Sequence, residues 1–267
     1  MMNISWNNLL FSNSQKHVSH AVFCALVMAV FWMANVTSAD VILHYSANGN
    51  VLDSSGNGHD GALFNGATYG TGVAGQAFSF DGINDFLEGP VVPQINPNAF
   101  SAAFWVNAAP VNGLQLVFDS SHGGTRNGSI NWEGFAFQFF SNNHIDFAFG
   151  NGTAFPHVLS TSVVADNSFH HVAATFDGSL MSLYIDGVLD NTAAFSGTPN
   201  ISGRPIRLGN HDQLTNRALN GLVDDVRLYN EVLSASQVQA LANIPEPGSL
   251  ALLAPAAIVM FMRRKRR

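Results

Sequence analysis

Large apolar residues alternate with small or polar residues in several short stretches of this chain, and this alternation restricts its fold more than any other feature. The clearest cases are 135–139 (FAFQF) and 145–149 (IDFAF), where phenylalanine or isoleucine takes every second position. Side chains of a β-strand point alternately to its two faces, so each stretch predicts a strand with one apolar face. Residues 172–176 repeat the pattern. We therefore expect many of the 21 phenylalanines to be buried between β-sheets.

Turn signals separate these strands. Asp177-Gly178 and Asp186-Gly187 stand where a tight hairpin turn would reverse the chain, since glycine tolerates the positive φ that such turns require. Only 234–242 has the pattern of a helix. The sequence therefore predicts an all-β fold, an antiparallel sandwich of two sheets.

The charge of the central region excludes one class of partner. Residues 40–243 contain 17 acidic residues, five arginines and no lysine, which gives a formal charge of −12. Such an acidic domain is poorly suited to a phosphate backbone. Nucleic acid is therefore not an expected partner.

Residues 1–39 have the features of a secretory signal peptide. Lys16 and His17 precede an apolar run at 21–34, and small residues lead up to Ala39. We expect cleavage after Ala39, followed by one exported domain over 40–243.

Residues 244–267 combine three features in a fixed order. Pro245-Glu246-Pro247 is followed by an apolar run at 249–262 and then by five basic residues. A helix of 14 residues extends about 21 Å, short of the roughly 30 Å hydrocarbon core, so the run suits a transient membrane segment better than a permanent anchor. The basic end is expected to stay in the cytoplasm. A plain tail anchor is the alternative.

This order of features resembles the PEP-CTERM sorting signal of exported Gram-negative proteins. The resemblance implies an exosortase-type protease as a partner, removal of the tail near Pro245, Glu246 and Pro247, and delivery to the cell surface or an extracellular polysaccharide matrix.

The central region carries a second resemblance. Its blocks are LDSSGNGHDG (52–61), GQAFSFDG (75–82), FSAAFWV (100–106), FHHVA (169–173), LYIDG (183–187) and GLVDDVRLYN (221–230). Together and in this order they resemble laminin G-like, concanavalin A-like jelly-roll domains, which are common in bacterial surface proteins. The resemblance implies two packed antiparallel sheets, pairing of the first and last strands, and a structural calcium ion near one rim.

An oxygen-rich loop carries Asp53 and Asn57 among serines and glycines. Carboxylate, amide and carbonyl oxygens are the ligands that calcium prefers. In the jelly-roll interpretation these two residues meet Asp224 or Asp225 of the closing strand. Strand alternation makes Asp224 the more enclosed of the two aspartates and places Asp225 beside Arg227, with which it can pair. The alternative is a network of Asx-turns that fixes the loop.

Several residues are candidates for ligand binding. They are Trp132, Phe155 and Tyr69 for stacking on a sugar ring, and His122 and Arg126 from a long polar loop. Aromatic residues are more often part of a core, so for them burial is the alternative.

Covalent catalysis is not expected. Glycosidases use two carboxylates on either side of the scissile bond, and between the two ends of the chain the glutamates are Glu88, Glu133 and Glu231, none of them in an E-x-D-x-E motif. His170 and His171 are adjacent on a predicted strand, so they point to opposite faces and cannot share a metal ion. No G-x-S-x-G motif is present.

We therefore expect an exported, non-catalytic surface or matrix protein that binds carbohydrate or matrix components. A purely structural surface protein and a polysaccharide hydrolase are the alternatives.

Overall fold

A computed structural model of the chain describes residues 39–126, 129–201, 203–211 and 216–243. Residues 1–38 of the predicted signal peptide, which ends at Ala39, lie outside the described residues, and so does the predicted sorting tail from residue 244. Within the described ranges, no helix is long and apolar enough to cross a membrane.

The larger of two main sheets, called sheet A here, has eight strands. Seven lie in the order β15 (Val188–Ala194), β14 (Leu180–Ile185), β13 (Phe169–Phe176), β6 (Phe100–Ala108), β17 (Asn220–Tyr229), β4 (Gln76–Asp81) and β3 (Thr68–Thr71), and β1 (Val41–Tyr45) pairs with β17 outside this path. All the pairings are antiparallel.

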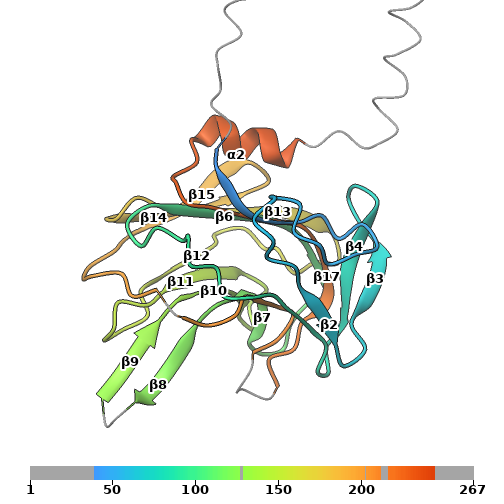
Figure 1. The fold of residues 1–267 in the computed structure, drawn as a ribbon, viewed down its shortest axis with the longest axis horizontal. Helices are drawn as coiled ribbons and strands as arrows, with labels where there is room; N and C mark the ends of the chain where they lie inside the picture. The colour runs from blue at the N-terminus through green and yellow to red at the C-terminus, as the bar shows by residue number, and fades with distance from the viewer. Residues whose placement is uncertain (1–38, 127–128, 202, 212–215, 244–267) are drawn as a thin grey trace, which may run out of the picture. The chain divides into compact units, whose positions relative to one another are not determined.

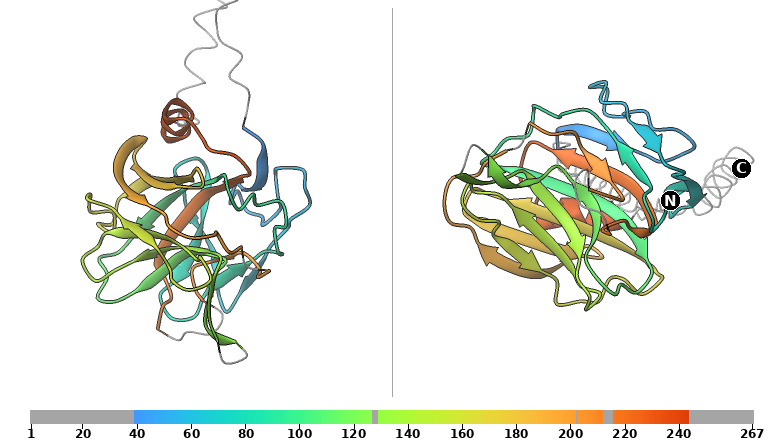
Figure 2. Two further views of the ribbon diagram at one scale, coloured as in Figure 1. Left: turned by 90° about the vertical axis from the view of Figure 1, so that its left-hand side faces the viewer. Right: turned by 90° about the horizontal axis from the view of Figure 1, so that it is seen from below.

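The second main sheet, called sheet B, has seven strands. Their order is β12 (His157–Leu159), β11 (Ile145–Phe149), β10 (Phe135–Phe139), β7 (Gln115–Asp119), β16 (Arg207–Leu208), β5 (Phe86–Glu88) and β2 (Ala62–Phe64). Figure 1 shows the two sheets stacked face to face, and Figure 2 gives the same sandwich from two further directions. The predicted fold, an antiparallel two-sheet sandwich of the jelly-roll type, is confirmed.

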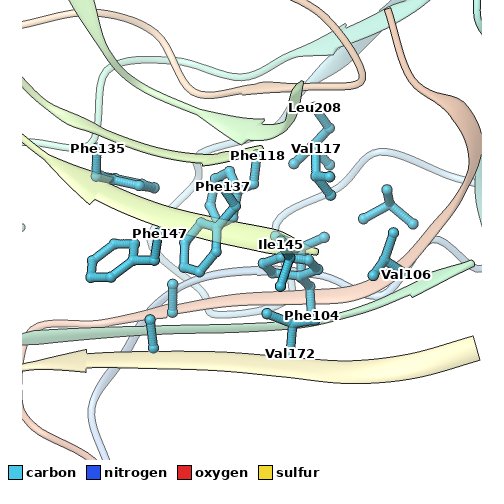
Figure 3. Close-up of a cluster of buried hydrophobic side chains, with 14 of the residues drawn as sticks. Phe104, Val106, Val117, Phe118, Phe135, Phe137, Ile145, Phe147, Val172 and Leu208 are labelled. Carbon is cyan, nitrogen blue, oxygen red and sulfur yellow. The ribbon is translucent and has the colours of Figure 1, made fainter. Parts of the chain in front are cut away.

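The hydrophobic core lies between the sheets and is rich in phenylalanine. Phe137 of β10 is the register partner of Phe147 of β11, and their rings stack with centroids 4.8 Å apart. Phe104 of β6 in sheet A meets Phe137 edge to face at 5.0 Å. These contacts, part of which Figure 3 shows, confirm the apolar faces predicted from the alternation.

Both predicted Asp-Gly turns are present. Asp186 and Gly187 have φ of 52° and 79° and join β14 to β15, as a two-residue hairpin turn with two positive φ angles requires. Gly178, with φ of 92°, lies in the turn between β13 and β14.

The two ends of the domain meet in sheet A. β1 pairs antiparallel with β17, which confirms the expected pairing of the first and last strands. The predicted helix forms as α2 (Ala235–Ala242), with Ser234 as its N-cap in a capping box. Buried Val238 packs with Ala103 and Ala173 on the outer face of sheet A.

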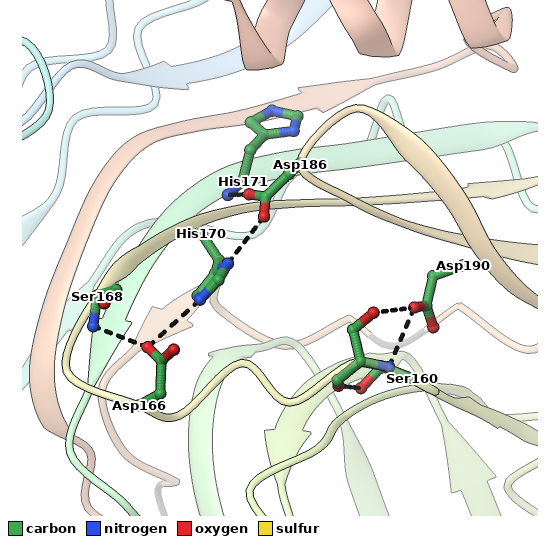
Figure 4. A network of polar contacts seen from close by, with 8 residues as sticks. Ser160, Asp166, Ser168, His170, His171, Asp186 and Asp190 are labelled. Atoms are coloured by element: carbon green, nitrogen blue, oxygen red, sulfur yellow. Dashed lines mark hydrogen bonds and ion pairs between the residues drawn. The ribbon is translucent and has the colours of Figure 1, made fainter.

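Asp190 of β15, which Figure 4 labels, joins neighbouring edges of the two sheets. Its carboxylate accepts hydrogen bonds from the backbone N–H and the hydroxyl of Thr161 at 2.5 and 2.9 Å, and from the hydroxyl of Ser162 at 2.6 Å. Thr161 and Ser162 follow the edge strand β12 of sheet B, and the side chain of Asn191 also donates to the carbonyl of Leu159 in β12. Polar contacts therefore close this side of the sandwich.

The adjacent histidines of β13 point to opposite faces, as predicted. His170 bonds to Asp186 at 2.9 Å and to Asp166 at 3.3 Å (Figure 4). His171 is buried on the other face beside Trp105, with ring centroids 5.2 Å apart.

The sequence predicted a polar loop around His122 and Arg126, and this prediction is wrong. These residues form β8 (His122–Arg126), which pairs in register with β9 (Ser129–Glu133) as a separate two-stranded sheet. Backbone pairing organises the segment despite its polar sequence, because hydrogen bonds across a hairpin do not require apolar side chains. The hairpin projects from the sandwich at one end of sheet B (Figure 1).

Candidate functional site

A cavity of about 400 Å³ lies on the outer face of sheet B, on the side away from the core. Ligand pockets commonly have volumes of roughly 300–1,000 Å³, so this cavity can hold a small molecule or a sugar unit. Its lining comes from β7, β9, β10, β11 and β12 and from loops beside them: Leu114, Leu116, Ser121, Trp132, Ala136, Gln138, Ala148, Phe155, His157, His211 and Arg217.

Two alanines form the floor of the cavity, and their small side chains leave space above the sheet. Ala136 of β10 and Ala148 of β11 are register partners, and both occupy the alternate positions between the core phenylalanines. Their side chains therefore face away from the core. A larger side chain at either position would fill the space that a ligand needs.

Two aromatic residues form one wall of the cavity. The rings of Trp132 and Phe155 lie 5.7 Å apart at an angle of 31°. The backbone of Trp132 pairs with that of Gly152 through two hydrogen bonds of 2.8 and 3.3 Å, which draws the loop bearing Phe155 toward β9. Gly150 allows this close approach, because a Cβ there would lie 2.5 Å from the carbonyl oxygen of Trp132.

A carboxylate is buried beneath the polar part of the cavity. Asp146 of β11 is completely buried and accepts a hydrogen bond of 3.0 Å from Nε2 of Gln138, its register partner. Its other oxygen lies 3.1 Å from Nδ1 of His157 on β12, without the geometry of a hydrogen bond. Gln138 and His157 both line the cavity, so Asp146 helps to hold two of its polar groups in place.

Burial raises the pKa of Asp146 to about 6, although Gln138 and His157 oppose the shift. A carboxyl with such a pKa changes charge within the physiological range. The charge of the carboxyl beneath the cavity therefore changes with pH.

A histidine and an arginine, His211 and Arg217, also line the cavity. His211 lies 3.8 Å from the carboxylate of Asp119, and both side chains are nearly buried. Arg217 is half-buried and lines the cavity. Within the part of the chain that the structure describes, its guanidinium makes no ion pair or hydrogen bond.

A second, smaller cavity of about 80 Å³ adjoins the first, and the two share Ser121. Its lining includes Arg204, Glu88 of β5 and Arg207 of β16. Arg207 donates two hydrogen bonds to Glu88, at 2.8 and 2.5 Å, and its guanidinium lies over the ring of Phe86 at 4.4 Å. The outer face of sheet B thus carries two neighbouring hollows.

The predicted ligand-binding residues are only partly brought together. Trp132 and Phe155 line the larger cavity, whereas Tyr69 packs against Phe78 in sheet A at 5.7 Å. The side chains of His122 and Arg126 lie outside what the structure describes, although their strand belongs to the hairpin that carries Trp132.

Four residues at or beneath the cavity were not among the predicted ligand-binding residues: Gln138, Asp146, His157 and Arg217. The alternation that predicted β10 and β11 also assigns Gln138 and Asp146 to the face opposite the core, and this signal was available in the sequence.

At the predicted calcium site, Asp53 holds the loop to the first strand. One carboxylate oxygen accepts the backbone N–H groups of His44 and Ser55 at 3.0 and 2.9 Å. The other accepts the hydroxyl of Ser55 and the N–H of His59 at 2.8 and 3.0 Å. Burial alone would raise the pKa of Asp53, but these hydrogen bonds lower it below its usual value. A carboxylate has about four acceptor positions, and the chain's own donors take all four here.

The other predicted ligands have separate partners. Asn57 donates to the backbone carbonyls of Val41 and Ile42, and Asp224 accepts from the backbone N–H of Val73 at 2.9 Å. Asp225 pairs with His44 and Arg227. Among the described residues, no group of three or more His, Cys, Asp or Glu side chains is arranged to hold a metal ion. As hydrogen-bonded here, the four residues do not fit one coordination sphere, and calcium at this position stays a prediction.

The two aspartates of the closing strand differ in the way that alternation predicts. Asp224 is 1% exposed, and burial raises its pKa to about 6. Asp225 pairs with Nε2 of His44 at 2.7 Å and with Arg227 at 2.9 Å, and these partners outweigh burial to lower its pKa. The expected pairing of Asp225 with Arg227 is confirmed.

Solved structures share this fold at low sequence identity. The binding domain of Paraclostridial Mosquitocidal Protein 1 is 15% identical with a TM-score of 0.61, covering 76% of this chain and 52% of that one. The binding domain of Botulinum neurotoxin DC, solved in complex with rat synaptotagmin II, is 16% identical with a TM-score of 0.62, covering 76% and 51%. The chain therefore spans about half the length of these toxin domains.

A third neighbour matches over nearly its whole length. Domain 4 of AbnA, a GH43 extracellular arabinanase from Geobacillus stearothermophilus solved with arabinotriose, is 20% identical with a TM-score of 0.57, covering 77% of this chain and 99% of that one. No curated protein sequence matches the chain.

A comparison of sequence identifies the family. The model of the concanavalin A-like lectin/glucanases superfamily of the laminin G type matches residues 81–239, more than half of the chain. This range includes the strands and loops that form both cavities. The chain belongs to the concanavalin A-like lectin/glucanase superfamily.

Proposed function

We propose that this protein is an exported, non-catalytic carbohydrate-binding module, and that the larger cavity on sheet B is its glycan site. The observation that carries the proposal is the cavity itself, in which the Trp132–Phe155 wall stands beside the polar groups of Gln138, His157 and Arg217. An aromatic ring packs well on the apolar C–H face of a sugar, while amides and charged groups bind its hydroxyls.

Two solved neighbours support this proposal. Domain 4 of the arabinanase was solved with arabinotriose, and a neurotoxin binding domain of the same fold was solved with SialylT. At 20% and 16% identity these neighbours establish the fold alone, so the glycan site of the present chain rests on its own residues.

A polysaccharide hydrolase is the second candidate, and one observation favours it. Asp146 has a pKa raised to about 6 by burial, which is a property of a general acid. Glycosidases also require a second carboxylate, at about 5–9.5 Å from the first. No carboxylate lines the larger cavity among the described residues, and Asp146 itself is completely buried beneath it. Binding without turnover is therefore the proposal.

Export and sorting are part of the proposal and rest on the sequence alone. The signal peptide ending at Ala39 would deliver the domain across the inner membrane, and the tail would be removed by an exosortase-type protease near Pro245, Glu246 and Pro247. Intact-mass measurement of the surface-released protein should give a chain that begins at Asp40 and ends near residue 246. A released protein that still carries residues 263–267 would contradict the sorting proposal.

A glycan screen tests the binding proposal. The protein is applied to an array of neutral and acidic plant and bacterial oligosaccharides, and the hits are measured by titration calorimetry. Trp132→Ala should weaken each hit about tenfold or more. Phe64→Ala is a matched control, because Phe64 is exposed to a similar extent, 40% against 36% for Trp132, but stacks on Phe86 away from the larger cavity.

The screen also separates the three candidate functions. Binding that depends on Trp132 supports the module. An absence of binding to every glycan would favour a purely structural surface protein. Release of shorter products from a bound polysaccharide, lost in Asp146→Asn, would establish a hydrolase and overturn the proposal.

A further inference from the structure

Positive charge is scarce in this domain, and much of it gathers at the two cavities. Residues 40–243 contain five arginines against 17 acidic residues. Arg204 and Arg207 line the smaller cavity together with two carboxylates, Glu88 and Asp119. Arg217 lines the larger cavity, whose described lining contains no carboxylate. The surface of such an acidic domain repels anions in general, so an arginine in a cavity without carboxylates marks the place where an anion can approach.

The arginines differ in their partners. Arg227 is held by Asp225, and Arg207 is held by Glu88. The guanidinium of Arg217, in contrast, has no ion pair or hydrogen bond within the described ranges and is half-buried at the wall of a cavity. The acids nearby are engaged by other groups: Asp146 by Gln138 and Asp119 by Ser121.

A neutral sugar would be a poor occupant of the space beside Arg217. Ligand binding removes water from a half-buried guanidinium, and the loss of that water is unfavourable unless a partner replaces it. A sugar hydroxyl provides one neutral acceptor. A carboxylate provides two charged oxygens whose spacing matches the guanidinium, so it forms shorter and stronger hydrogen bonds.

We propose, on the basis of the carbohydrate-binding function above, that the ligand is an acidic glycan whose sugar carboxylate pairs with Arg217 while a neighbouring ring packs against Trp132. The adjoining cavity at Arg204 and Arg207 lies next to this position and shares Ser121 with it. Its volume of about 80 Å³ suits a substituent of the next sugar better than a whole ring. Because Glu88 and Asp119 also line the smaller cavity and Arg207 is paired with Glu88, the position for the acid group is the one beside Arg217. The ligand is then a glycan that contains a uronate or a similar carboxylated sugar.

The test compares acidic polymers with neutral copies of themselves. Oligosaccharides of galacturonate, glucuronate and mannuronate are used in their native form and after reduction of each carboxylate to a primary alcohol, which keeps the ring and the linkage. At least one acidic form should bind about tenfold more tightly than its reduced form, and the difference should shrink between 0.05 and 0.5 M salt because salt screens the ion pair.

Variants locate the effect. Arg217→Gln should abolish the preference for the acidic form, because it lowers the affinity for the acidic form far more than the affinity for the reduced form, whereas Trp132→Ala should weaken both. Asn96→Asp is a control for net charge, since it changes the charge by the same single unit outside both cavities and retains the oxygen that accepts the N–H of Asn98. It should leave the preference intact.

Two outcomes would overturn the inference, and they are distinguishable from failure of the binding function. Equal affinity for acidic and reduced forms, both dependent on Trp132, would retain the glycan site and remove the acidic ligand. A preference for the acidic form that persists in Arg217→Gln would place the anion elsewhere. If no oligosaccharide binds in any form, the carbohydrate-binding function fails together with the inference.

Discussion

Nδ1 of His157 lies 3.1 Å from the buried carboxylate of Asp146, so an exposed histidine at the cavity is tied to an acid beneath it. The pairing crosses from β12 to β11, and Gln138 of β10 bonds to the same carboxylate. Three neighbouring strands therefore contribute to one polar cluster under the cavity. Because burial holds the pKa of Asp146 near 6, the charge of this cluster depends on pH.

Two buried aspartates predict a change of stability with pH. Burial raises the pKa of both Asp146 and Asp224 to about 6, above the ordinary value of 3.8. Folding therefore favours their protonated forms, and the stabilisation this provides below pH 4 is lost as the pH rises through 6. His170, whose pKa is raised, acts in the same direction, whereas His171, whose pKa burial lowers to about 4, acts in the opposite one.

Substitution isolates the contribution of Asp224. Between pH 7 and pH 5 the native protein should gain on the order of 1 kcal/mol of unfolding free energy from Asp224, which Asp224→Asn should not gain. Asparagine retains an oxygen that can accept the N–H of Val73, so the fold is preserved. Urea unfolding at the two pH values measures the difference. A native protein and variant with the same pH dependence would show that Asp224 is ionised throughout this range.

The contact between the sheet edges predicts a loss of stability. Asp190→Ala removes the acceptor for two N–H groups and two hydroxyls of Thr161 and Ser162. Since these groups are partly reached by water, we expect a loss of about 2 kcal/mol rather than the sum of four buried hydrogen bonds. Asp190→Asn, which retains one acceptor, should lose less. Urea unfolding at pH 7 checks both, and an Asp190→Ala protein as stable as the native one would show that the edge contact contributes nothing.

Asp53 should stabilise the fold without a metal ion. Its carboxylate accepts four hydrogen bonds from the chain, so Asp53→Ala should lower the melting temperature by roughly 4–8 °C, the equivalent of about 2 kcal/mol, even in a chelator. Melting curves with calcium and with chelator are the measurement.

The same curves test the calcium prediction. If calcium binds at Asp53, it raises the melting temperature of the native protein and not that of Asp53→Ala. Equal melting temperatures of the native protein with and without calcium would leave Asp53 as an anchor of the loop alone.

The sequence predicted the parts of this structure that depend on local patterns. Alternation identified β10, β11 and the buried faces of both, and the Asp186-Gly187 pair identified a hairpin turn. Alternation also predicted that Asp224 is more enclosed than Asp225. Each of these features is set by neighbours within a few residues.

The candidate site depends on contacts that no local pattern contains. Trp132 and Phe155 meet because backbone hydrogen bonds join Trp132 on β9 to Gly152 in the loop that bears Phe155. The sequence predicted which residues of β10 and β11 face away from the core. It did not predict that a cavity forms on that face, because one of the residues that line the cavity, Arg217, comes from a loop far away in the sequence. The polar loop expected around His122 formed a hairpin for the same reason, because its partner strand was not visible as a pattern.

Filling the cavity tests the account most directly. Ala148→Phe places a ring on the floor of the larger cavity, which Ala148 lines, and leaves the Trp132–Phe155 wall in place. The variant should keep a melting temperature close to that of the native protein and lose at least about tenfold in affinity for the glycan found by the screen, as measured by titration calorimetry. A folded Ala148→Phe protein that binds this glycan with native affinity would show that the cavity on sheet B is not the binding site.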